Sequence, residues 1–525
     1  MAMNLKERFY FTGLFFALLI GGAISSLIFP PFQNMLWGYV ALVLFLAYLL
    51  GAEHSKKKLF WSAYCFGATF YIVGFSWINN ALLIDSGKFE AFIPLLVLAV
   101  GAFFGLFWAI PAVFSVYGKQ NIYSRALIFC IFYVLWEWVR SFIFTGVPWN
   151  LLGSALSFDV RYIQGAAWIG TYGLSLVLLL LLCGIAILIS GGWQKRFYKG
   201  SLLFILLPLL FIYATTYRYH QKSDIISADK LVVRLVQPSI PQTFKWQPES
   251  LYKNFRTYID LSKKGSENGY LSLDEVDLVV WGETATPYFL DRDEVHRAEI
   301  KEAIPQGGFL ATGILRLTME KGEIVPYNSL FVLNDEGEIK DYYDKAHLVP
   351  FGEYLPFREH LPSFMKPVAD IVGTLGKGEK YKNIRVDGLP LMGGAICYES
   401  IFPKEVLNPQ EKPEVLLVLA NDGWYGISSG PYQHLAAAQM RAVEEGVTVI
   451  RSANNGISAV IAANGEILGK IDLDKAEITD VAISKPLSLT TFYGKYGNVI
   501  PLGLTVLLLI VALALSGYFN RKNIS

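Results

Sequence analysis

Charge is distributed very unevenly along this chain of 525 residues. Residues 1–217 hold only 19 of the 89 lysine, arginine, aspartate and glutamate residues, and the remaining part of the chain holds the other 70. Long apolar stretches fill the first part. A run of about 20 mostly apolar residues is long enough to cross the hydrocarbon core of a bilayer as a helix, and lipid allows a single segment almost no other structure. We therefore expect the first part of the chain to lie in a membrane.

Eight runs of this kind occur, seven before residue 218 and one near the end of the chain. We place them at 9–29, 35–51, 59–78, 91–117, 125–144, 166–190, 200–217 and 498–518. The second and third are the weakest, since the third contains Ser62 and Tyr64, so the count is open by one. The first lacks a small-residue cleavage site, so we interpret it as a membrane helix rather than a signal peptide. The sequence predicts a multi-pass α-helical membrane bundle with eight transmembrane helices.

Basic residues in the short loops predict the orientation of this bundle. Twelve lie in alternate loops and would share one side of the membrane: Lys6, Arg8, Lys56, Lys57, Lys58, Lys119, Arg125, Lys195, Arg196, Lys199, Arg521 and Lys522. The opposite loops hold Lys88, Arg140 and Arg161. Lys and Arg are retained on the cytoplasmic side. Both termini are therefore expected in the cytoplasm, with the long segment between the seventh and eighth helices outside.

That long segment has the pattern of one α/β domain, because short Val, Ile and Leu runs alternate with helical stretches and with Gly, Pro, Asn and Asp. Strands are expected at 231–236, 276–281, 309–315, 329–333, 391–396, 415–420, 447–451 and 458–461. The clearest helix covers 432–445 and ends at Gly446, and turns fall at 334–337 and 464–465. We predict a membrane domain at 1–217, an extracytoplasmic domain at 218–495, and the eighth helix with a cytoplasmic tail at 496–525. The net charge of +1 gives no sign of nucleic-acid binding.

Cys397 is the only cysteine in the predicted external domain, since Cys65, Cys130 and Cys183 lie in apolar runs. A structural cysteine in an oxidising compartment is normally paired. Cys397 follows an apolar strand directly, and polar residues follow it. Backbone N–H groups at such a turn face the sulfur and favour the thiolate. The pattern indicates a nucleophile, with a thiol packed at a strand end as the alternative.

Two other segments could activate this thiol. Glu283 follows the apolar strand at 276–281, where partial burial suits a general base; a surface acid is the alternative. Lys345 lies in an aromatic segment eight residues before Glu353; a solvated lysine is the alternative. The five external histidines have no spacing that singles one out, so a cysteine protease has no specific support. No metal-binding motif, phosphate-binding loop or cofactor motif occurs.

The order of Trp281-Gly282-Glu283, Tyr343-Asp344-Lys345 and Ile396-Cys397-Tyr398 resembles the nitrilase superfamily, whose α/β domain is an α-β-β-α sandwich with a Glu-Lys-Cys triad. The stretch Lys345–Pro356, the loop Gly146-Val147-Pro148-Trp149 and the predicted helices resemble the apolipoprotein N-acyltransferase family. Asn421-Asp422 and the segment 451–456 also resemble this family. Val447 departs from the family, where we expect an arginine.

The resemblance implies a ping-pong N-acyltransferase. It would move the sn-1 acyl chain of a phospholipid, typically phosphatidylethanolamine, through a cysteine thioester to the α-amino group of the N-terminal diacylglyceryl-cysteine of a lipoprotein. Glu283 would act as base and Cys397 as nucleophile. Lys345 and the N–H of Tyr398 would stabilise the oxyanion. No cofactor is implied, and the setting is the bacterial inner membrane, with the catalytic domain in the periplasm.

Further residues are expected to support this site. By resemblance Glu353 supports the triad, and Tyr398 and Glu399 shape the surroundings of the nucleophile. Asn328 is expected to be a further supporting or substrate-binding residue. Trp149 and Trp246 are candidate gates for acyl chains, with ordinary interfacial tryptophan as the alternative.

Two rival functions have less support from the sequence. A membrane-anchored amidase or nitrilase would use the same triad but would leave most of the predicted helices unexplained. A transporter would place ionisable residues inside the membrane. The predicted helices hold few such residues, namely Glu137 and Arg140 near one end, so a transporter is disfavoured.

Overall fold

The computed structural model describes residues 5–51, 55–84, 90–118, 121–190, 195–220, 230–356, 374–484 and 488–522. Lys88 and Lys119, two of the loop residues used above, lie outside these ranges. The chain divides into two compact units. One consists of Met1–Gln221 with Tyr496–Ser525, and the other of Lys222–Lys495.

The first unit is helical. Its main helices are α1 (Leu5–Ser25), α2 (Met35–Gly51), α3 (Lys56–Gly74), α4 (Asn79–Leu83), α5 (Ile93–Phe104), α6 (Leu106–Phe114), α7 (Ile122–Val139), α8 (Ala166–Ser190), α9 (Lys195–His220) and α16 (Val499–Lys522). Five helical stretches of the described chain are long and apolar enough to span a bilayer, and a bent pair, Lys56–Gly74 with Ser76–Leu83, would make a sixth. Two shorter apolar helices are Thr12–Ile28 and Met35–Gly51. The structure thus has several apolar helices but does not establish the predicted eight spans.

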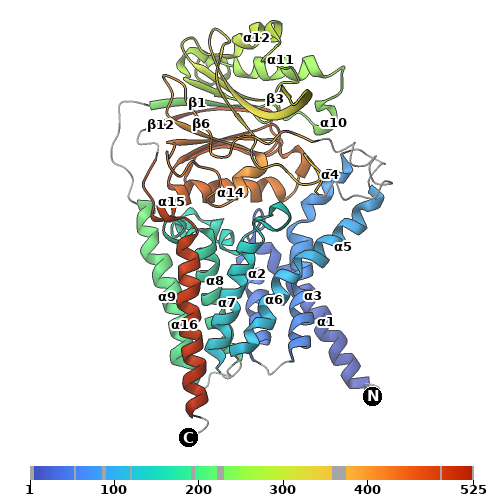
Figure 1. Ribbon diagram of the computed structural model, residues 1–525, viewed down its shortest axis with the longest axis vertical. Coiled ribbons are helices and arrows are strands. Elements are labelled where there is room, and N and C mark those ends of the chain that lie inside the picture. Colours follow the sequence, from blue (N-terminus) through green and yellow to red (C-terminus); the bar gives the residue numbers. More distant parts are fainter. Residues whose placement is uncertain are drawn as a thin grey trace. The chain divides into compact units, whose positions relative to one another are not determined.

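The last helix of the chain packs among helices from its first half. The hydroxyl of Ser124 in α7 donates to the carbonyl of Ala512 in α16 over 2.8 Å. Figure 1 shows α7, α8 and α16 side by side, and α9 lies against α8. Residues separated by the whole second unit in the sequence therefore form one helical unit.

Glu137 and Arg140, at the C-terminal end of α7, bind the loop that follows the helix. The guanidinium of Arg140 donates to the carbonyl of Trp149 over 2.8 Å, and the carboxylate of Glu137 accepts from the amide of Leu152 over 2.7 Å. Both side chains are 1% exposed. These charges therefore fix the loop that carries Trp149, which gives them a structural role.

The second unit contains two six-stranded sheets. The first has the order β12 (Glu477–Ser484), β1 (Lys230–Gln237), β2 (Leu278–Val280), β3 (Phe309–Glu320), β4 (Glu323–Asn334), β5 (Ile339–Asp344). The second has the order β11 (Ile467–Ile471), β10 (Ser458–Ile461), β9 (Thr448–Ala453), β8 (Val415–Ala420), β7 (Met392–Ile396), β6 (Asn383–Ile384). All eight predicted strands are present. The four that the sequence did not indicate, β5, β6, β11 and β12, are short or contain charged residues.

Side-chain alternation along the strands builds four layers. In β8, Val415, Leu417 and Leu419 pack into the core between the two sheets. Leu416 and Val418 point the other way, into a cluster with α14 (Gly430–Glu445). On the outer face of the first sheet, α11 (Leu251–Ser262) and α12 (Glu294–Ile300) pack against its strands (Figure 1). The second unit is therefore an α-β-β-α sandwich.

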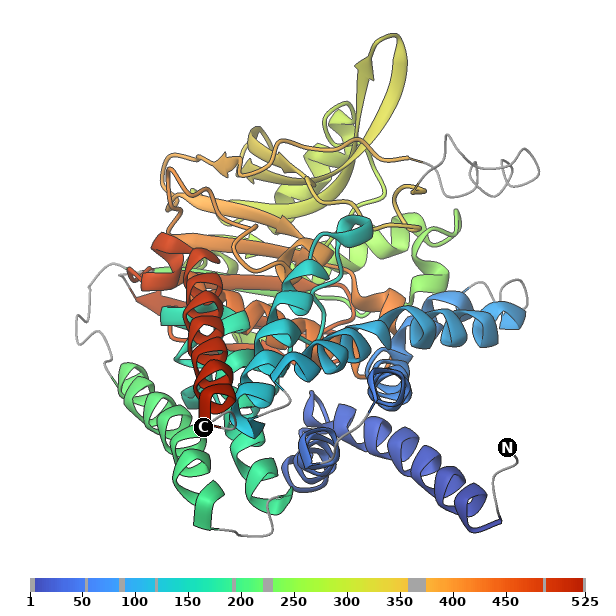
Figure 2. The same cartoon turned by 60° about the horizontal axis from the view of Figure 1, so that its bottom comes forward.

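Two features of the strand pairing stand out. β3 and β4 form a long hairpin that extends beyond the rest of the sheet (Figure 2). The first and last strands of the unit, β1 and β12, pair antiparallel along their whole length, from Lys230 opposite Ser484 to Gln237 opposite Glu477.

Candidate active site

Cys397 lies at a sharp turn between a strand and a helix. β7 ends at Ile396, and a short 3-10 helix, Cys397–Ile401, begins at the cysteine. Cys397 is a free thiol, 6% exposed, with a φ of +52°. A positive φ is uncommon for a non-glycine residue and costs energy that the surrounding structure must offset. The predicted turn at the cysteine is confirmed.

Glu283 is positioned by the strands on either side of its loop. Its amide donates to the carbonyl of Ala420, at the end of β8, over 3.2 Å. A Cβ at Gly313 in β3 would lie 2.7 Å from the Cα of Glu283, so only glycine allows this close approach. The carboxylate accepts a hydrogen bond from the side-chain amide of Asn328 over 2.7 Å. Glu283 is 7% exposed and is not a surface acid.

Lys345 follows β5 and is 1% exposed, so it is not solvated. Its Nζ lies 2.8 Å from Oε1 of Glu353 and 3.6 Å from Oε1 of Glu283. Burial lowers the pKa of this lysine, but the carboxylates of Glu353 and Glu283 outweigh burial, and the net pKa is raised. Lys345 is therefore a stable ammonium group at neutral pH.

The pKa of the Cys397 thiol is raised, so the expectation that the turn favours the thiolate was wrong. Burial raises its pKa, the carboxylate of Glu283 raises it further, and Lys345 and the main-chain N–H of Asn421 lower it; the net pKa is raised. The hydroxyl of Tyr425 lies 3.9 Å from Sγ. A thiol in this state needs a base that takes its proton as the sulfur reacts.

Glu399 ties the loop after Lys345 to the turn at the cysteine. Its Oε1 accepts from the amides of Ala346 and His347, each over 2.8 Å. The same oxygen accepts from the hydroxyl of Tyr343 over 2.9 Å. Its Oε2 accepts from the amide of Ile396 over 2.7 Å. Burial raises the pKa of this carboxyl, in spite of these donors. Glu399 thus joins the two segments through three main-chain N–H groups and one hydroxyl.

Three more residues of the predicted site have different positions. Tyr398 is 7% exposed, and its ring packs edge-on against Phe402 at 5.2 Å. Trp246 is 43% exposed and directly follows α10 (Gln242–Lys245) in the second unit. Trp149 lies in the first unit, where it is 3% exposed with its ring centroid 4.4 Å from that of Trp77. Trp149 is therefore a buried residue and not part of an exposed interfacial belt.

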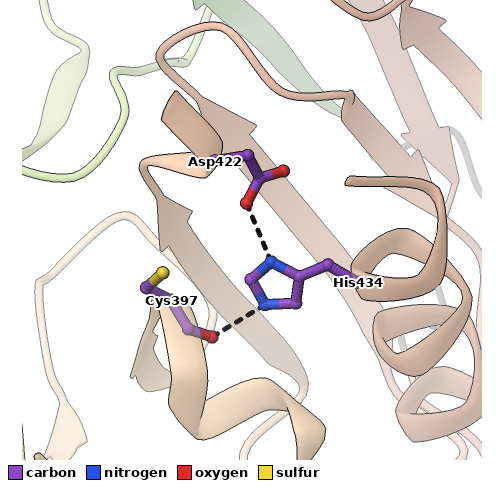
Figure 3. Close-up of side chains that lie close together, drawn as sticks. All are labelled: Cys397, Asp422 and His434. Carbon is purple, nitrogen blue, oxygen red and sulfur yellow. Dashed lines mark hydrogen bonds and ion pairs between the residues drawn. The ribbon is translucent and has the colours of Figure 1, made fainter. Parts of the chain in front are cut away.

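A buried histidine lies close to Cys397 but binds its carbonyl (Figure 3). Nε2 of His434 is 3.0 Å from the carbonyl oxygen of Cys397, and Nδ1 is 2.8 Å from Oδ1 of Asp422. Arg451 donates to the other oxygen of Asp422 over 2.7 Å. Burial lowers the pKa of His434. This network supports the strained turn, and a Cys–His pair of the protease kind would need the ring to face the sulfur instead.

Three residues of this region form the one cluster of potential metal ligands among the described residues. Cys397, Asp422 and His434 each offer a ligand atom, and these atoms lie within 4.8 Å of one another. Both ring nitrogens of His434 already have hydrogen-bond partners. The hydrogen bonds therefore account for the arrangement.

The structure brings together Glu283, Lys345, Cys397, Glu353, Glu399 and Asn328. Val447, where we expected an arginine, is fully buried in the apolar cluster around α14. Sequence reasoning missed the roles of Lys245, Asp422, His434 and Arg451. Asp422 and Arg451 do lie in segments singled out by the sequence, and Lys245 precedes Trp246. Their contacts are with main-chain groups, with hydroxyl groups such as that of Thr284, or with each other, and no spacing in the sequence reveals such contacts.

Comparisons with known proteins cover both units. The carbon-nitrogen hydrolase family matches residues 232–488, and the apolipoprotein N-acyltransferase N-terminal domain matches residues 21–185. Proteins named apolipoprotein N-acyltransferase match almost the whole chain. One from Brucella melitensis is 34% identical over 516 residues, covering 95% of this chain and 94% of that protein. One from Rickettsia bellii is 34% identical over 518 residues, covering 96% and 97%, and one from Rhodopseudomonas palustris is 30% identical over 505 residues, covering 94% of each.

Proposed function

Because the chain belongs to the apolipoprotein N-acyltransferase family, we propose that Glu283, Lys345 and Cys397 transfer an acyl chain from a phospholipid to a lipoprotein in two half-reactions. Family membership makes the chain an acyltransferase of the nitrilase superfamily. The roles of the three residues are our proposal.

In the first half-reaction the thiol of Cys397 gives its proton to Glu283 as the sulfur attacks the carbonyl carbon of the sn-1 ester. Lys345 and the N–H of Tyr398 stabilise the oxyanion of the tetrahedral intermediate. The bond from carbon to the glycerol oxygen then breaks, and Glu283 returns the proton to that oxygen. Lysophospholipid leaves, and a thioester remains on Cys397.

In the second half-reaction the α-amino group of the diacylglyceryl-cysteine attacks the thioester. Glu283 takes a proton from the nitrogen, the carbon–sulfur bond breaks, and the sulfur regains a proton. The product is an N-acylated lipoprotein. The observation that carries the proposal is the state of Cys397: its raised pKa calls for a base, and Glu283 beside Lys345 supplies one.

Exposed apolar side chains on the loops of the site support lipid substrates. Trp246 is 43% exposed, Trp424 is 45% exposed, and Phe351, between Lys345 and Glu353, is 70% exposed. Exposed apolar groups gathered around one site are typical of contact with lipid or with a partner. We propose phosphatidylethanolamine as the donor, with Trp246 as a gate for its acyl chain.

The location of the protein follows from the family and the apolar helices, which indicate a bacterial inner-membrane protein. We propose eight transmembrane helices with both termini in the cytoplasm. In this proposal 218–495 is the periplasmic catalytic domain, and 1–217 with 496–525 is the membrane domain.

Mass spectrometry of the full-length protein incubated with phosphatidylethanolamine tests the proposal. One acyl adduct on Cys397 is expected in the wild type and none in Cys397→Ser, with Cys65→Ala as the matched control. Glu283→Gln should still bind phospholipid but should acylate far more slowly. Release of free fatty acid, with neither an adduct on Cys397 nor transfer of the acyl chain to a diacylglyceryl peptide, would identify a hydrolase. Normal turnover by Cys397→Ser would overturn the assignment of the nucleophile.

A further inference from the structure

A second buried lysine contacts the loop of Glu283. Lys245, the last residue of α10, is 5% exposed. Its Nζ donates to the main-chain carbonyl of Glu283 over 2.9 Å and lies 2.8 Å from the hydroxyl oxygen of Thr284. Burying a long cationic side chain is unfavourable unless its donors are satisfied. These contacts therefore indicate a specific role for the amine.

The hydrogen bond from Lys245 means that both main-chain polar groups of Glu283 have a partner. The amide of Glu283 is bound to Ala420 of the second sheet, and its carbonyl is bound to Lys245. Thr284 has a φ of +45°, which is uncommon for a β-branched residue and needs support from its surroundings. Loss of the amine would free the carbonyl of Glu283 and the strained residue after it.

α10 also contacts the loop beside the nucleophile. The side-chain oxygen of Gln242 accepts from the amide group of Asn421 over 2.9 Å, and the main-chain N–H of Asn421 faces the sulfur of Cys397. Phe244 and Trp246, on either side of Lys245, are 51% and 43% exposed. One short helix thus joins an exposed aromatic pair to the loops of both reacting groups.

We propose that Lys245 is a positioning residue that holds the backbone of Glu283 and so sets where its carboxylate meets the thiol of Cys397. This inference rests on the proposed role of Glu283 as the base. The amine contacts no reacting atom and acts through the main chain.

The hydrogen bonds that Lys245 donates are stronger in its ammonium form than in its neutral form, so this role depends on pH. Burial lowers its pKa to about 8, while the carboxylate of Glu283 and the sulfur of Cys397 raise it. Glu283 belongs to the loop after β2 and Cys397 to the turn after β7, and Lys345 lies 3.6 Å from the same carboxylate. The ammonium form is present below about pH 8 and is lost as the pH rises through that value. Adduct formation should therefore fall on the alkaline side.

The test is the rate of acyl-adduct formation on Cys397 of the full-length enzyme with phosphatidylethanolamine, from about pH 6 to about pH 10. Thr284→Val keeps the shape of the side chain but removes one acceptor of the ammonium. The alkaline fall in rate should then begin at a lower pH than in the wild type. Lys245→Met should react about 10-fold to 100-fold more slowly at neutral pH and should lack this alkaline fall. Lys253→Met, at an exposed lysine of α11, should match the wild type.

Unchanged pH profiles in both Thr284→Val and Lys245→Met would overturn the positioning role. If Lys245→Met does not fold, as judged by thermal unfolding, the isosteric Thr284→Val still decides the question. Absence of any adduct in the wild type would instead count against the proposed function, so the two failures are distinguishable.

Discussion

Two buried lysines reach Glu283 from different elements, and their pKa values are shifted in opposite directions. Lys345 is 1% exposed and Lys245 is 5% exposed, so burial acts on both in the same sense. The nearest acceptor oxygen lies 2.8 Å from Nζ in both lysines. Lys345 faces the carboxylates of Glu353 and Glu283, and its pKa is raised in spite of burial. Lys245 faces a carbonyl and a hydroxyl, and burial lowers its pKa to about 8.

The difference teaches that the charge of the partner, rather than the length of the hydrogen bond, decides the state of a buried amine. A carboxylate stabilises the ammonium form by its charge, whereas a neutral oxygen offsets little of the cost of burial. The protein thus has one cation of raised pKa at the proposed oxyanion site and one cation of lowered pKa on the backbone of the proposed base.

Removal of the cation of raised pKa should have the largest effect. Lys345→Met leaves Glu283 and Glu353 without their shared cation and removes a proposed oxyanion donor. The rate of adduct formation on Cys397 should fall about 10²-fold to 10³-fold. Mass spectrometry over time measures it, with the exposed Lys340→Met as control. A variant that retains more than about a tenth of the rate would show that the ammonium is not an oxyanion donor.

Asp422 extends the comparison to a buried acid. Burial raises its pKa, but Arg451 and His434 outweigh burial, and the net pKa is lowered. Its contribution to stability is present above about pH 4, the ordinary value, and is lost as the pH falls through the lowered pKa. Asp422→Asn should reduce the free energy of unfolding by about 3 kcal/mol at neutral pH, because Arg451 is left buried without its anion.

Thermal and denaturant unfolding of the full-length protein measure this loss, and Asp387→Asn at an exposed position is the control. The difference in the free energy of unfolding between wild type and Asp422→Asn should become smaller as the pH is lowered. A difference that stays constant with pH would mean that charge pairing does not cause it.

Glu353→Gln should make Lys345 more like Lys245. With one of its two carboxylates gone, burial is opposed less strongly and the pKa of Lys345 falls. The adduct rate should drop about tenfold at neutral pH, the effect of one weakened charged hydrogen bond, and further as the pH rises. The exposed Glu338→Gln serves as control. An unaltered pH dependence would contradict the role given to Glu353.

The smallest effect is expected at an exposed pair of similar geometry. Lys380 lies 3.0 Å from Glu405, close to the 2.8 Å between Lys345 and Glu353, but its side chain is 47% exposed. Water and salt screen such a pair, so Lys380→Met should change the free energy of unfolding by less than about 1 kcal/mol. Denaturant unfolding at low and high salt measures it. A cost as large as that of Asp422→Asn would show that burial does not explain the difference.

Much of the second unit was predictable because parallel strands such as β2, β7 and β8 are apolar and polar residues follow each of them. That pattern located Glu283 and Cys397 after strand ends, and Gly446 marked the end of the clearest helix. β5 was not predicted, because Lys340, Asp341 and Asp344 interrupt its apolar residues at the edge of a sheet. The catalytic roles stay predictions until an adduct is measured.

Other parts could not be inferred for physical reasons. Lys245 lies on a helix of four residues, too short for any periodicity, and its partners include a main-chain carbonyl that every residue possesses. The number of spans depends on backbone breaks such as the 50° bend between Lys56–Gly74 and Ser76–Leu83, which apolar composition does not report.

The pairing of β1 with β12 has a consequence for how such a molecule is assembled. Neighbouring strands lie about 5 Å apart, so the first strand of the sandwich begins close to where its last strand ends, with Lys230 opposite Ser484. A domain whose two ends are close together can be inserted into one loop between two helices of another domain without separating those helices. The same adjacency would let a short artificial linker close the excised sandwich into a ring or permit new termini elsewhere on its surface.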